Sequence, residues 1–340
     1  MTRDEEKMSN IPKINIMFDM RAPDFGAAIS DLYTAALDMA AFCDEMGVYS
    51  INVMEHHGSD DGYLPSPFVL AGGVAARTKQ ARILLGAVIL PLHDPVKIAE
   101  QIAILDIMSK GRVEIVFGAG YVPSEFAMFA VSLRDRGRLL NEGIDVILRA
   151  LRGERFEHDG RPIYVRPLPI QAPEDIIMVG GGVEASAKRA ARFGVGFAPM
   201  QPGLMPVYEE ACRELGRAPG KKWEPSAALP LSIHLAEDPE AGWKLIEPHA
   251  LHIVSEYAKW ADQEANSHSP FKDLHDAAAL RASGLFAVWT PEELIARVSN
   301  LESNARLGLM PLLGGLPPEH GWSSLKLLQQ CLPDLRKHQQ

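Results

Sequence analysis

The chain has 340 residues, with 34 Lys and Arg against 44 Asp and Glu, which gives a formal net charge of −10 at pH 7. Apolar residues make up 47 % and charged residues 23 %, which is ordinary for a globular protein and excludes an intrinsically disordered one. The acidic balance argues against nucleic-acid binding, and no apolar run reaches the ~20 residues of a membrane span.

From residue 13 onward, short apolar runs alternate with longer amphipathic patterns. The apolar runs predict strands at 13–20, 49–55, 81–90, 112–120, 174–182, 195–200, 227–238 and 307–315. The amphipathic patterns predict helices at 27–47, 68–77, 96–108, 136–151, 184–193, 205–215, 291–304 and 322–332. Eight βα units of this kind favour a single (β/α)8 TIM barrel over residues 1–340, and an open doubly wound sheet is the alternative.

Local signals support these boundaries. Gly47 stands where a C-cap glycine is expected, and Asp94 is a candidate N-cap for the helix that follows it. Three stretches, 119–135, 153–172 and 267–290, are predicted to be long irregular loops, which are usually either functional or disordered. Because barrel active sites lie at the C-terminal ends of the strands, we expect chemistry in residues that directly follow a strand.

The ends of the chain and its cysteines indicate a compartment. Residues 1–12 form a polar tail without the apolar segment of a signal peptide, so we expect a cytoplasmic protein. Cys43, Cys212 and Cys331 are far apart and not in CxxC spacing, which predicts neither a disulfide framework nor a zinc site.

Glu55, His56 and His57 directly follow the second predicted strand and precede a loop rich in Gly and Pro. Two adjacent imidazoles can act as a general base or bind an anion, and they can also hold a metal or serve packing alone. Adjacent residues of an extended chain point to opposite faces, so one ring is expected at the barrel mouth and the other outside it. Because HxxxH and HExxH spacings are absent, no metal site is predicted.

Gly180, Gly181 and Gly182 join a strand to a helix, and such a turn exposes backbone N–H groups that bind phosphate. A tight connection without a ligand is the alternative. Arg138, at the start of another helix, is a candidate cationic partner for the same phosphate or an ordinary surface arginine. His93 reads as an isolated structural loop histidine, and Glu100 as part of a solvated helix face.

These segments together resemble the bacterial luciferase-like family of flavin-dependent monooxygenases, from about residue 14 to 321. The quoted motifs are EHH with its following loop, LPLHDPVKIAEQIAILDIMSKGR, VGGGVEASAKRAARFGVGFAP and MPLLGGLPPEHGW. The resemblance implies a (β/α)8 barrel that binds reduced FMN (FMNH2) at its C-terminal mouth. It also implies that reaction with O2 gives a flavin C4a-peroxide, which oxygenates a small organic substrate.

The resemblance implies a homodimer and a separate NAD(P)H:flavin reductase, in agreement with the lack of a GxGxxG segment. His56 matches the active-site histidine of the family, and Gly86 and Ala87 match a strand that carries a non-prolyl cis peptide in members of the family. The positions implied to lie near the cofactor are Phe18, Glu55, Gly86, Ala87, Arg138, Gly180, Gly181 and Gly182.

The sequence departs from luciferase at Gly118 and Ala119, where luciferase has Cys and Arg, so light emission is not expected. The long mobile loop of luciferase has no obvious counterpart, although residues 267–290 are a candidate lid. Two alternatives to the monooxygenase stay open. One is an oxidoreductase that uses the deazaflavin F420 on the same barrel, and the other is a non-catalytic flavin-binding subunit. EHH favours FMN over F420, and the presence of His56 argues against the non-catalytic subunit.

Overall fold

The structure is a computed structural model that describes residues 13–337 except 202, 225–228, 264–270, 272, 273, 275, 299, 300 and 302–304. The polar tail 1–12, the start of the strand predicted at 227–238 and the end of the helix predicted at 291–304 lie outside the described residues. So does part of the candidate lid 267–290. The described chain divides into two compact units, residues 13–51, 59–63 and 229–337 and residues 52–58 and 64–224. The single domain over residues 1–340 stays a prediction.

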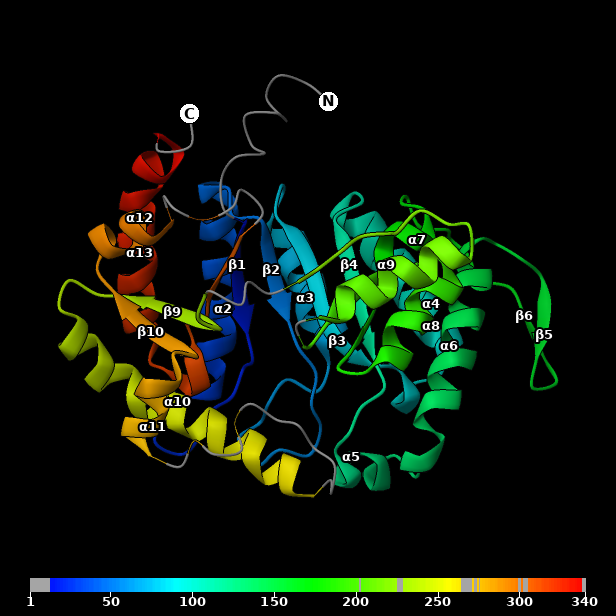
Figure 1. The fold of residues 1–340 in the computed structure, drawn as a ribbon, viewed down its shortest axis with the longest axis horizontal. Coiled ribbons are helices and arrows are strands. Elements are labelled where there is room, and N and C mark those ends of the chain that lie inside the picture. The colour runs from blue at the N-terminus through cyan, green and yellow to red at the C-terminus, as the bar shows by residue number, and fades with distance from the viewer. Residues whose placement is uncertain are drawn as a thin grey trace. The chain divides into compact units, whose positions relative to one another are not determined.

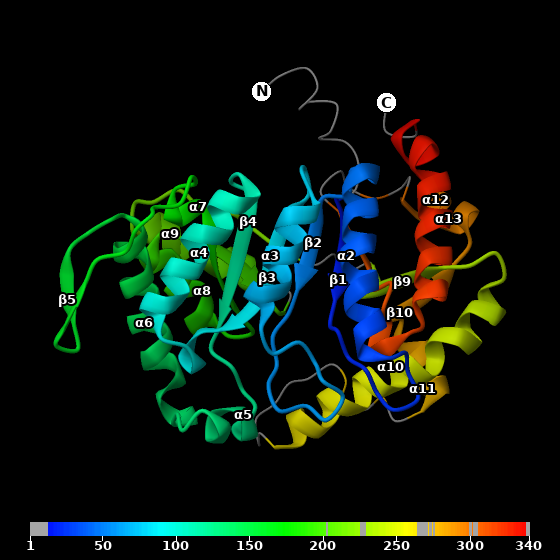
Figure 2. The same cartoon turned by 180° about the vertical axis from the view of Figure 1, so that it is seen from behind.

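The first unit combines the N-terminal and C-terminal parts of the chain. Its elements are β1 (Lys13–Phe18), α2 (Ile29–Met46), β9 (Ser232–Leu235), α10 (Pro239–Asp262), α11 (Ala277–Ser283), β10 (Phe286–Trp289), α12 (Pro291–Val298), β11 (Arg306–Leu309), the 3-10 helix η3 (Leu313–Gly315) and α13 (Pro318–Lys337). Helices α2 and α13 lie side by side (Figure 2). Strand β2 (Ser50–Val53) is shared, since its first two residues belong to this unit and its last two to the other.

The second unit continues the alternation of strands and helices. Its elements are α3 (Pro67–Arg77), β3 (Arg82–Ile89), η1 (Leu90–Leu92), α4 (Pro95–Ser109), β4 (Val113–Gly118), α5 (Pro123–Met128), η2 (Leu133–Asp135), α6 (Arg136–Leu151), β5 (Phe156–His158), β6 (Arg161–Ile163), α7 (Pro173–Ile176), β7 (Ile177–Gly181), α8 (Glu184–Phe193), β8 (Gly196–Pro199) and α9 (Leu204–Glu214). Figure 1 shows the hairpin β5–β6 extending away from α6.

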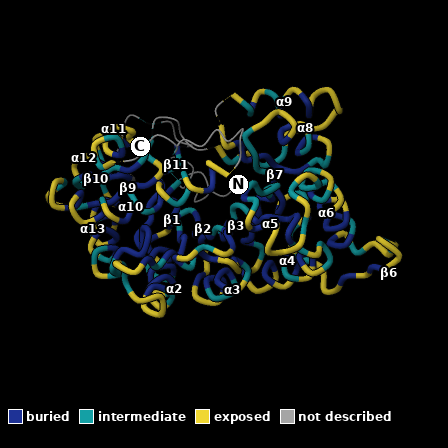
Figure 3. Tube along the Cα trace, turned by 90° about the horizontal axis from the view of Figure 1, so that it is seen from below, coloured by how far each residue is buried: buried dark blue, intermediate teal, exposed yellow. Residues whose placement is uncertain are grey.

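Seven strands form one hydrogen-bonded sheet in the order β11-β1-β2-β3-β4-β7-β8. The pairs β11–β1, β3–β4, β4–β7 and β7–β8 are parallel, and β9 and β10 form a separate parallel pair. Most residues of the sheet strands are buried, whereas the helices carry the exposed positions (Figure 3). Parallel strands that alternate with helices confirm the predicted α/β fold class of TIM-barrel type.

The helix signals read from the sequence have the expected physical basis. In α2, the predicted face of Leu32, Ala36, Met39, Ala40 and Cys43 is buried. The helix ends at Gly47, whose φ of 78° is accessible to glycine at little cost. At α4, the Asp94 side chain accepts hydrogen bonds from the N–H groups of Val96 and Lys97, as expected of an N-cap.

The three stretches predicted to be irregular contain secondary structure. Residues 119–135 include α5 and η2, and residues 153–172 include the antiparallel hairpin β5–β6. The described part of 267–290 contains α11 and β10. Helix α10 was not predicted, because Pro248 interrupts its otherwise helical pattern. The cysteines are buried free thiols, and no described helix is long and apolar enough to cross a membrane.

Candidate active site

His56 follows the C-terminal end of β2 and is held by a buried glutamate. Its Nδ1 lies 2.7 Å from Oε1 of Glu125, and its ring meets the Tyr121 ring edge-on at 5.9 Å between centroids. The same Glu125 oxygen accepts a hydrogen bond of 2.8 Å from the main-chain N–H of His57. In the tautomer that carries its proton on Nδ1, this Glu125 oxygen accepts that proton and Nε2 is the basic nitrogen of His56.

Glu125 lies in the first turn of α5 and is 1 % exposed. Among the hydrogen bonds of the described residues, none reaches its second carboxylate oxygen, Oε2. A buried carboxylate that is hydrogen-bonded to an imidazole fixes a catalytic histidine in one tautomer and one orientation. Glu125 was not singled out from the sequence, and the only signal for it was its place in the long stretch 119–135 after a strand.

Glu55 binds two other histidines. Its Oε1 lies 3.2 Å from Nε2 of His57 and 2.6 Å from Nε2 of His93, and its Oε2 accepts the N–H of Ile89 at 2.6 Å. His93 is therefore not the isolated histidine that the sequence indicated. His56 and His57 are both buried, and they are held by different glutamates. Glu55 faces these three partners in the structure, and its predicted place near a cofactor stays a prediction.

The middle of β3 presents backbone at its surface. Gly86 and Ala87 are half-buried, whereas the other residues of the strand from Ile83 onward are buried. The peptide bond between Gly86 and Ala87 is cis, as the resemblance implied. A Cβ added at the neighbouring Gly118 would lie 3.2 Å from Cβ of Ala87. Glycine at position 118 therefore lets β4 approach Ala87 closely.

The glycine turn connects β7 to α8 as expected. A Cβ at Gly180 would lie 2.7 Å from Cγ1 of Val116, and one at Gly181 would lie 2.1 Å from Oγ of Ser186, so packing alone requires both glycines. A Cβ at Gly182 would make only ordinary contacts, at 3.5 Å. Helix α8 begins without a capping side chain, so no side chain occupies its first N–H groups.

Arg138 lies on the exposed face of α6, where it pairs with Glu142 at 2.8 Å and with Asp135 at 3.5 Å. Glu100 is exposed on α4 and pairs with Lys97, which agrees with a solvated helix face. Phe18 is completely buried in the first unit. The predicted cofactor contacts of Phe18 and Arg138 stay predictions.

A second buried group of charges lies in the first unit, after β1. Arg21 forms an ion pair with Asp61 and lies 4.0 Å from Asp19, and Asp61 also lies 2.7 Å from Nε2 of His252. Burial raises the pKa of Asp19 to about 6, although the neighbouring Arg21 lowers it. Burial also acts to raise the pKa of Asp61, but the hydrogen bond with His252 and the charge of Arg21 hold it below its usual value.

Aromatic rings surround the Arg21 guanidinium. Its carbon Cζ lies 4.4 Å from the centroid of Tyr63, 5.3 Å from that of Tyr257 and 5.1 Å from that of Trp260. Rings at these distances attract the cation through their electron-rich faces. Arg21 is 0 % exposed, so Asp61 and these rings enclose its guanidinium within the first unit.

The sequence of the chain matches a known protein family over most of its length. The sequence profile of the luciferase-like monooxygenases matches residues 16–305. The chain belongs to the luciferase-like monooxygenase family. This membership confirms the resemblance read from the EHH, MSKGR and GGG segments.

Individual luciferase-like relatives match over part of their length. The chain is 32 % identical over 167 residues to 4-hydroxyprotoasukamycin monooxygenase of Streptomyces nodosus subsp. asukaensis, covering 44 % of this chain and 45 % of that protein. It is 28 % identical over 198 residues to the oxygenase component of a flavin-dependent trigonelline monooxygenase of Acinetobacter baylyi, covering 54 % and 55 %. The chain spans about half the length of the curated relatives it matches.

Solved structures of the luciferase-like fold align over nearly the whole chain. Monooxygenase RslO1 from Streptomyces bottropensis aligns with a TM-score of 0.76 and 24 % identity, covering 94 % of this chain and 98 % of the other. The oxygenating constituent of 3,6-diketocamphane monooxygenase from Pseudomonas putida, in complex with FMN, aligns with a TM-score of 0.66 and 18 % identity, covering 97 % and 98 %. An F420-dependent secondary alcohol dehydrogenase aligns with a TM-score of 0.65 and 17 % identity, covering 96 % and 99 %. These likenesses show the fold.

Proposed function

We propose that this protein is the oxygenase component of a two-component monooxygenase that uses FMNH2 and O2 to oxygenate a small organic substrate. The observation that carries the proposal is the buried His56–Glu125 pair at the end of β2, in a chain of the luciferase-like family. The names of a relative, a flavin-dependent oxygenase component, and of an FMN-bound structural neighbour support the choice of cofactor.

The residues present fit a flat ring that carries a phosphate. The half-buried backbone at Gly86 and Ala87 has no large side chain to block a ring, and the uncapped start of α8 after Gly182 has N–H groups for a phosphate. Bound FMNH2 would supply the activation of O2, which no side chain can provide. The protein would contribute orientation of the ring and exclusion of water.

His56 is assigned the proton chemistry. With Nδ1 directed at Glu125, its Nε2 can accept a proton from one reacting group and return it to another without reorientation of the ring. Glu125 stabilises the protonated form of the imidazole and prevents its rotation. Glu125 is therefore a positioning residue, and His56 is the catalytic one.

The proposed oxygenase depends on a separate NAD(P)H:flavin reductase. The name of the trigonelline relative, an oxygenase component, supports this partner.

The proposed protein is also a homodimer. A groove of about 370 Å³ between α3 and α4 supports this state, because its apolar residues Val69, Ile104 and Met108 are 75 %, 46 % and 49 % exposed and a second copy would cover them.

The test is the variant His56→Ala, with His158→Ala as the matched control. His158 lies on β5 and pairs with Asp159, so its loss should change neither binding nor turnover. For His56→Ala we expect anaerobic FMNH2 binding within about twofold of wild type and a loss of product formation of about 10²-fold or more. Unchanged product formation in His56→Ala would remove this residue from the mechanism.

An F420-dependent oxidoreductase is the second candidate, because an F420-dependent dehydrogenase shares the fold. A paired anaerobic titration with FMNH2 and with F420, read by fluorescence or calorimetry, separates the two. Tight binding of FMNH2 supports the monooxygenase, and tight binding of F420 alone supports hydride transfer. Binding of neither cofactor would favour a non-catalytic subunit.

A further inference from the structure

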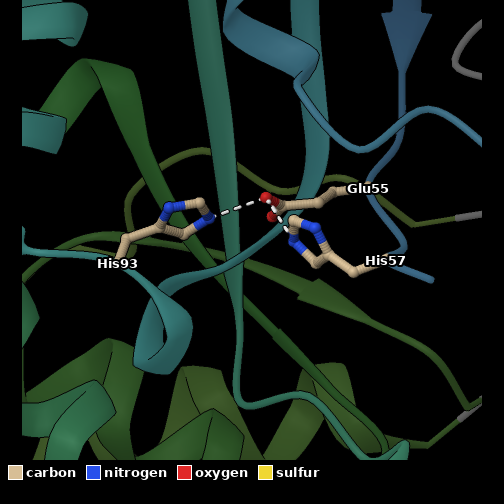
Figure 4. Close-up of side chains that lie close together, drawn as sticks. All are labelled: Glu55, His57 and His93. Carbon is tan, nitrogen blue, oxygen red and sulfur yellow. Dashed lines mark hydrogen bonds and ion pairs between the residues drawn. The ribbon is translucent and has the colours of Figure 1, made fainter. Parts of the chain in front are cut away.

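Glu55, His57 and His93 form a compact group, the Glu55 cluster, within the second unit. Glu55 and His57 follow β2, and His93 follows the 3-10 helix η1. Both imidazoles direct Nε2 at one carboxylate oxygen, Oε1 of Glu55, at 3.2 Å and 2.6 Å. Figure 4 shows the two interactions meeting at the Glu55 carboxylate.

The carboxylate of the Glu55 cluster is buried beside imidazoles. The Glu55 side chain is 0 % exposed, and among the described residues its ion-pair partners are His57 and His93, not Lys or Arg. A metal cation held between the two imidazoles and the carboxylate would supply the positive charge that stabilises a buried carboxylate.

The potential metal-ligand atoms of Glu55, His57 and His93 lie close together. In the described part of the chain, these three residues each offer one ligand atom, and the atoms all lie within 4.8 Å of one another. The N–H of Ile89 occupies Oε2 at 2.6 Å, which leaves Oε1 as the ligand oxygen and fixes its direction. Two imidazole nitrogens and one carboxylate oxygen are a known ligand set for Zn²⁺ and neighbouring transition metals.

We propose that Glu55, His57 and His93 bind one divalent transition-metal ion of the Zn²⁺ class. Three protein ligands leave a coordination position for water. Binding needs the lone pair of Nε2 on both rings, so each ring carries its remaining proton on Nδ1, and any extra proton held by the cluster passes to solvent. Metal affinity therefore falls as the pH falls.

The distances also indicate which ligand residue has to move when a metal ion binds. Ligand atoms around Zn²⁺ lie roughly 3.3 Å apart when each is about 2.0 Å from the ion in a tetrahedral site. The distance from Glu55 to His57 already fits, at 3.2 Å, whereas the distance to His93 has to increase from 2.6 Å. The His57 ring packs edge-on against Phe129, with 4.6 Å between centroids, while the His93 side chain is 24 % exposed in a loop. His93 is thus both the residue free to move and the route of entry.

The ion would join two loops of the second unit, the segment after β2 and the turn that precedes α4. This role differs from that of His56, whose Nδ1 faces Glu125 and not the Glu55 cluster. Because the proposal concerns metal binding, its test does not depend on the flavin or on turnover.

The experiment uses the full chain, treated with a chelator and then dialysed. Titration with ZnCl2 by calorimetry should show one site per chain that weakens as the pH is lowered, and CoCl2 should give the visible absorption of a low-symmetry cobalt site. His93→Gln and Glu55→Gln should each weaken Zn²⁺ binding by at least about tenfold, since even the loss of an outer partner has that effect. His158→Gln is the control and should bind as wild type does.

Three results of the binding titrations would overturn the proposal. They are the absence of a saturable site in the wild type, an affinity unchanged in His93→Gln, and a site that His158→Gln also removes. Because Glu55→Gln alters a buried group, the midpoint of thermal unfolding is measured for each variant with and without Zn²⁺. A bound ion raises the midpoint of the wild type and not that of the part-exposed variant His93→Gln, whereas an equal rise in both would also contradict the assignment.

Discussion

Oε1 of Glu125 lies 2.7 Å from Nδ1 of His56, although 69 positions separate the two residues in the chain. The contact exists because parallel strands bring the segment after β2 and the segment after β4 to the same edge of the sheet in the second unit. The role proposed for His56 therefore depends on Glu125, which lies outside the EHH segment that contains His56.

The first prediction concerns Glu125→Gln. A glutamine amide keeps the size of the side chain but can present its NH2 group to the imidazole, which removes the fixed tautomer. We expect product formation to fall by about 10²-fold while FMNH2 binding is retained, as for other groups that orient a catalytic base. A loss in kcat with little change in KM is expected for a positioning residue, and restored product formation in Glu125→Asp would separate positioning from simple loss of folding.

The second prediction concerns Asp19 and pH. Because burial raises its pKa to about 6, the folded chain binds a proton between pH 4 and 6 that the unfolded chain does not. The contribution of Asp19 to the free energy of unfolding is thus highest below pH 4 and falls by about 3 kcal/mol as the pH rises through 6. The pKa of Asp61 is lowered instead, so its contribution is lost only at more acidic pH. Urea unfolding of Asp19→Asn should show a flatter profile from pH 4 to 7.

The exposed Asp24 is the control for this experiment. Asp24→Asn should leave the pH profile of the free energy of unfolding unchanged. A slope that is the same in Asp19→Asn and in the wild type would contradict the assignment to Asp19.

The third prediction concerns Arg21→Met. Removal of the guanidinium leaves Asp61 and Asp19 buried without their cationic partner, which we expect to lower the free energy of unfolding by about 3–5 kcal/mol. Chemical denaturation measures this loss. Arg213→Met removes an exposed partner of Glu210 and should leave stability within experimental error.

The fourth prediction separates Gly181 from Gly182 in the glycine turn. Gly181→Ala places a Cβ 2.7 Å from Cβ of Ser186, so stability should fall by about 1–3 kcal/mol. Gly182→Ala meets nothing closer than 3.5 Å and should fold normally. If the turn binds the phosphate of FMN, Gly182→Ala weakens FMNH2 binding by about tenfold, or about 1.4 kcal/mol. Unchanged affinity would leave the turn as a tight connection.

The fifth prediction concerns the groove between α3 and α4. Met108→Lys places a charge in the apolar surface, and we expect it to convert a homodimer to monomers, as measured by light scattering after size-exclusion chromatography. Leu215→Lys is the control, since Leu215 is 52 % exposed after α9 and does not line the groove. A dimer that persists in Met108→Lys would place the interface elsewhere.

Local sequence patterns predict many of the helices and strands of this fold. Helices α6 and α8 begin and end where the sequence predicted, because each has an apolar face with helical spacing. Helix α10 is longer, with 24 residues, but Pro248 lies inside it, and the sequence did not predict it because proline normally ends a helix. The hairpin β5–β6 was missed because its strands have three residues each, although Asp159 and Gly160 at its turn are a recognised signal.

Some residues of the candidate site could likewise be predicted from local sequence, and others could not. His56 and the glycine turn were recognised because they adjoin strand ends in the sequence. Glu125 and His93 act through partners that are distant in the chain, at separations of 69 and 38 positions, so no local pattern could assign them. Long-range contacts of this kind follow from the sheet order and not from any one segment.

The aromatic enclosure of Arg21 gives the first unit its own optical signal. The Trp260 ring is 7 % exposed and lies 5.3 Å and 6.1 Å from the rings of Tyr257 and Tyr63, so energy absorbed by the tyrosines can pass to the indole. Emission from such a shielded indole shifts to longer wavelength when water reaches it. The difference in fluorescence between the wild type and Trp260→Phe therefore follows the opening of the first unit, because every ring of the enclosure belongs to it.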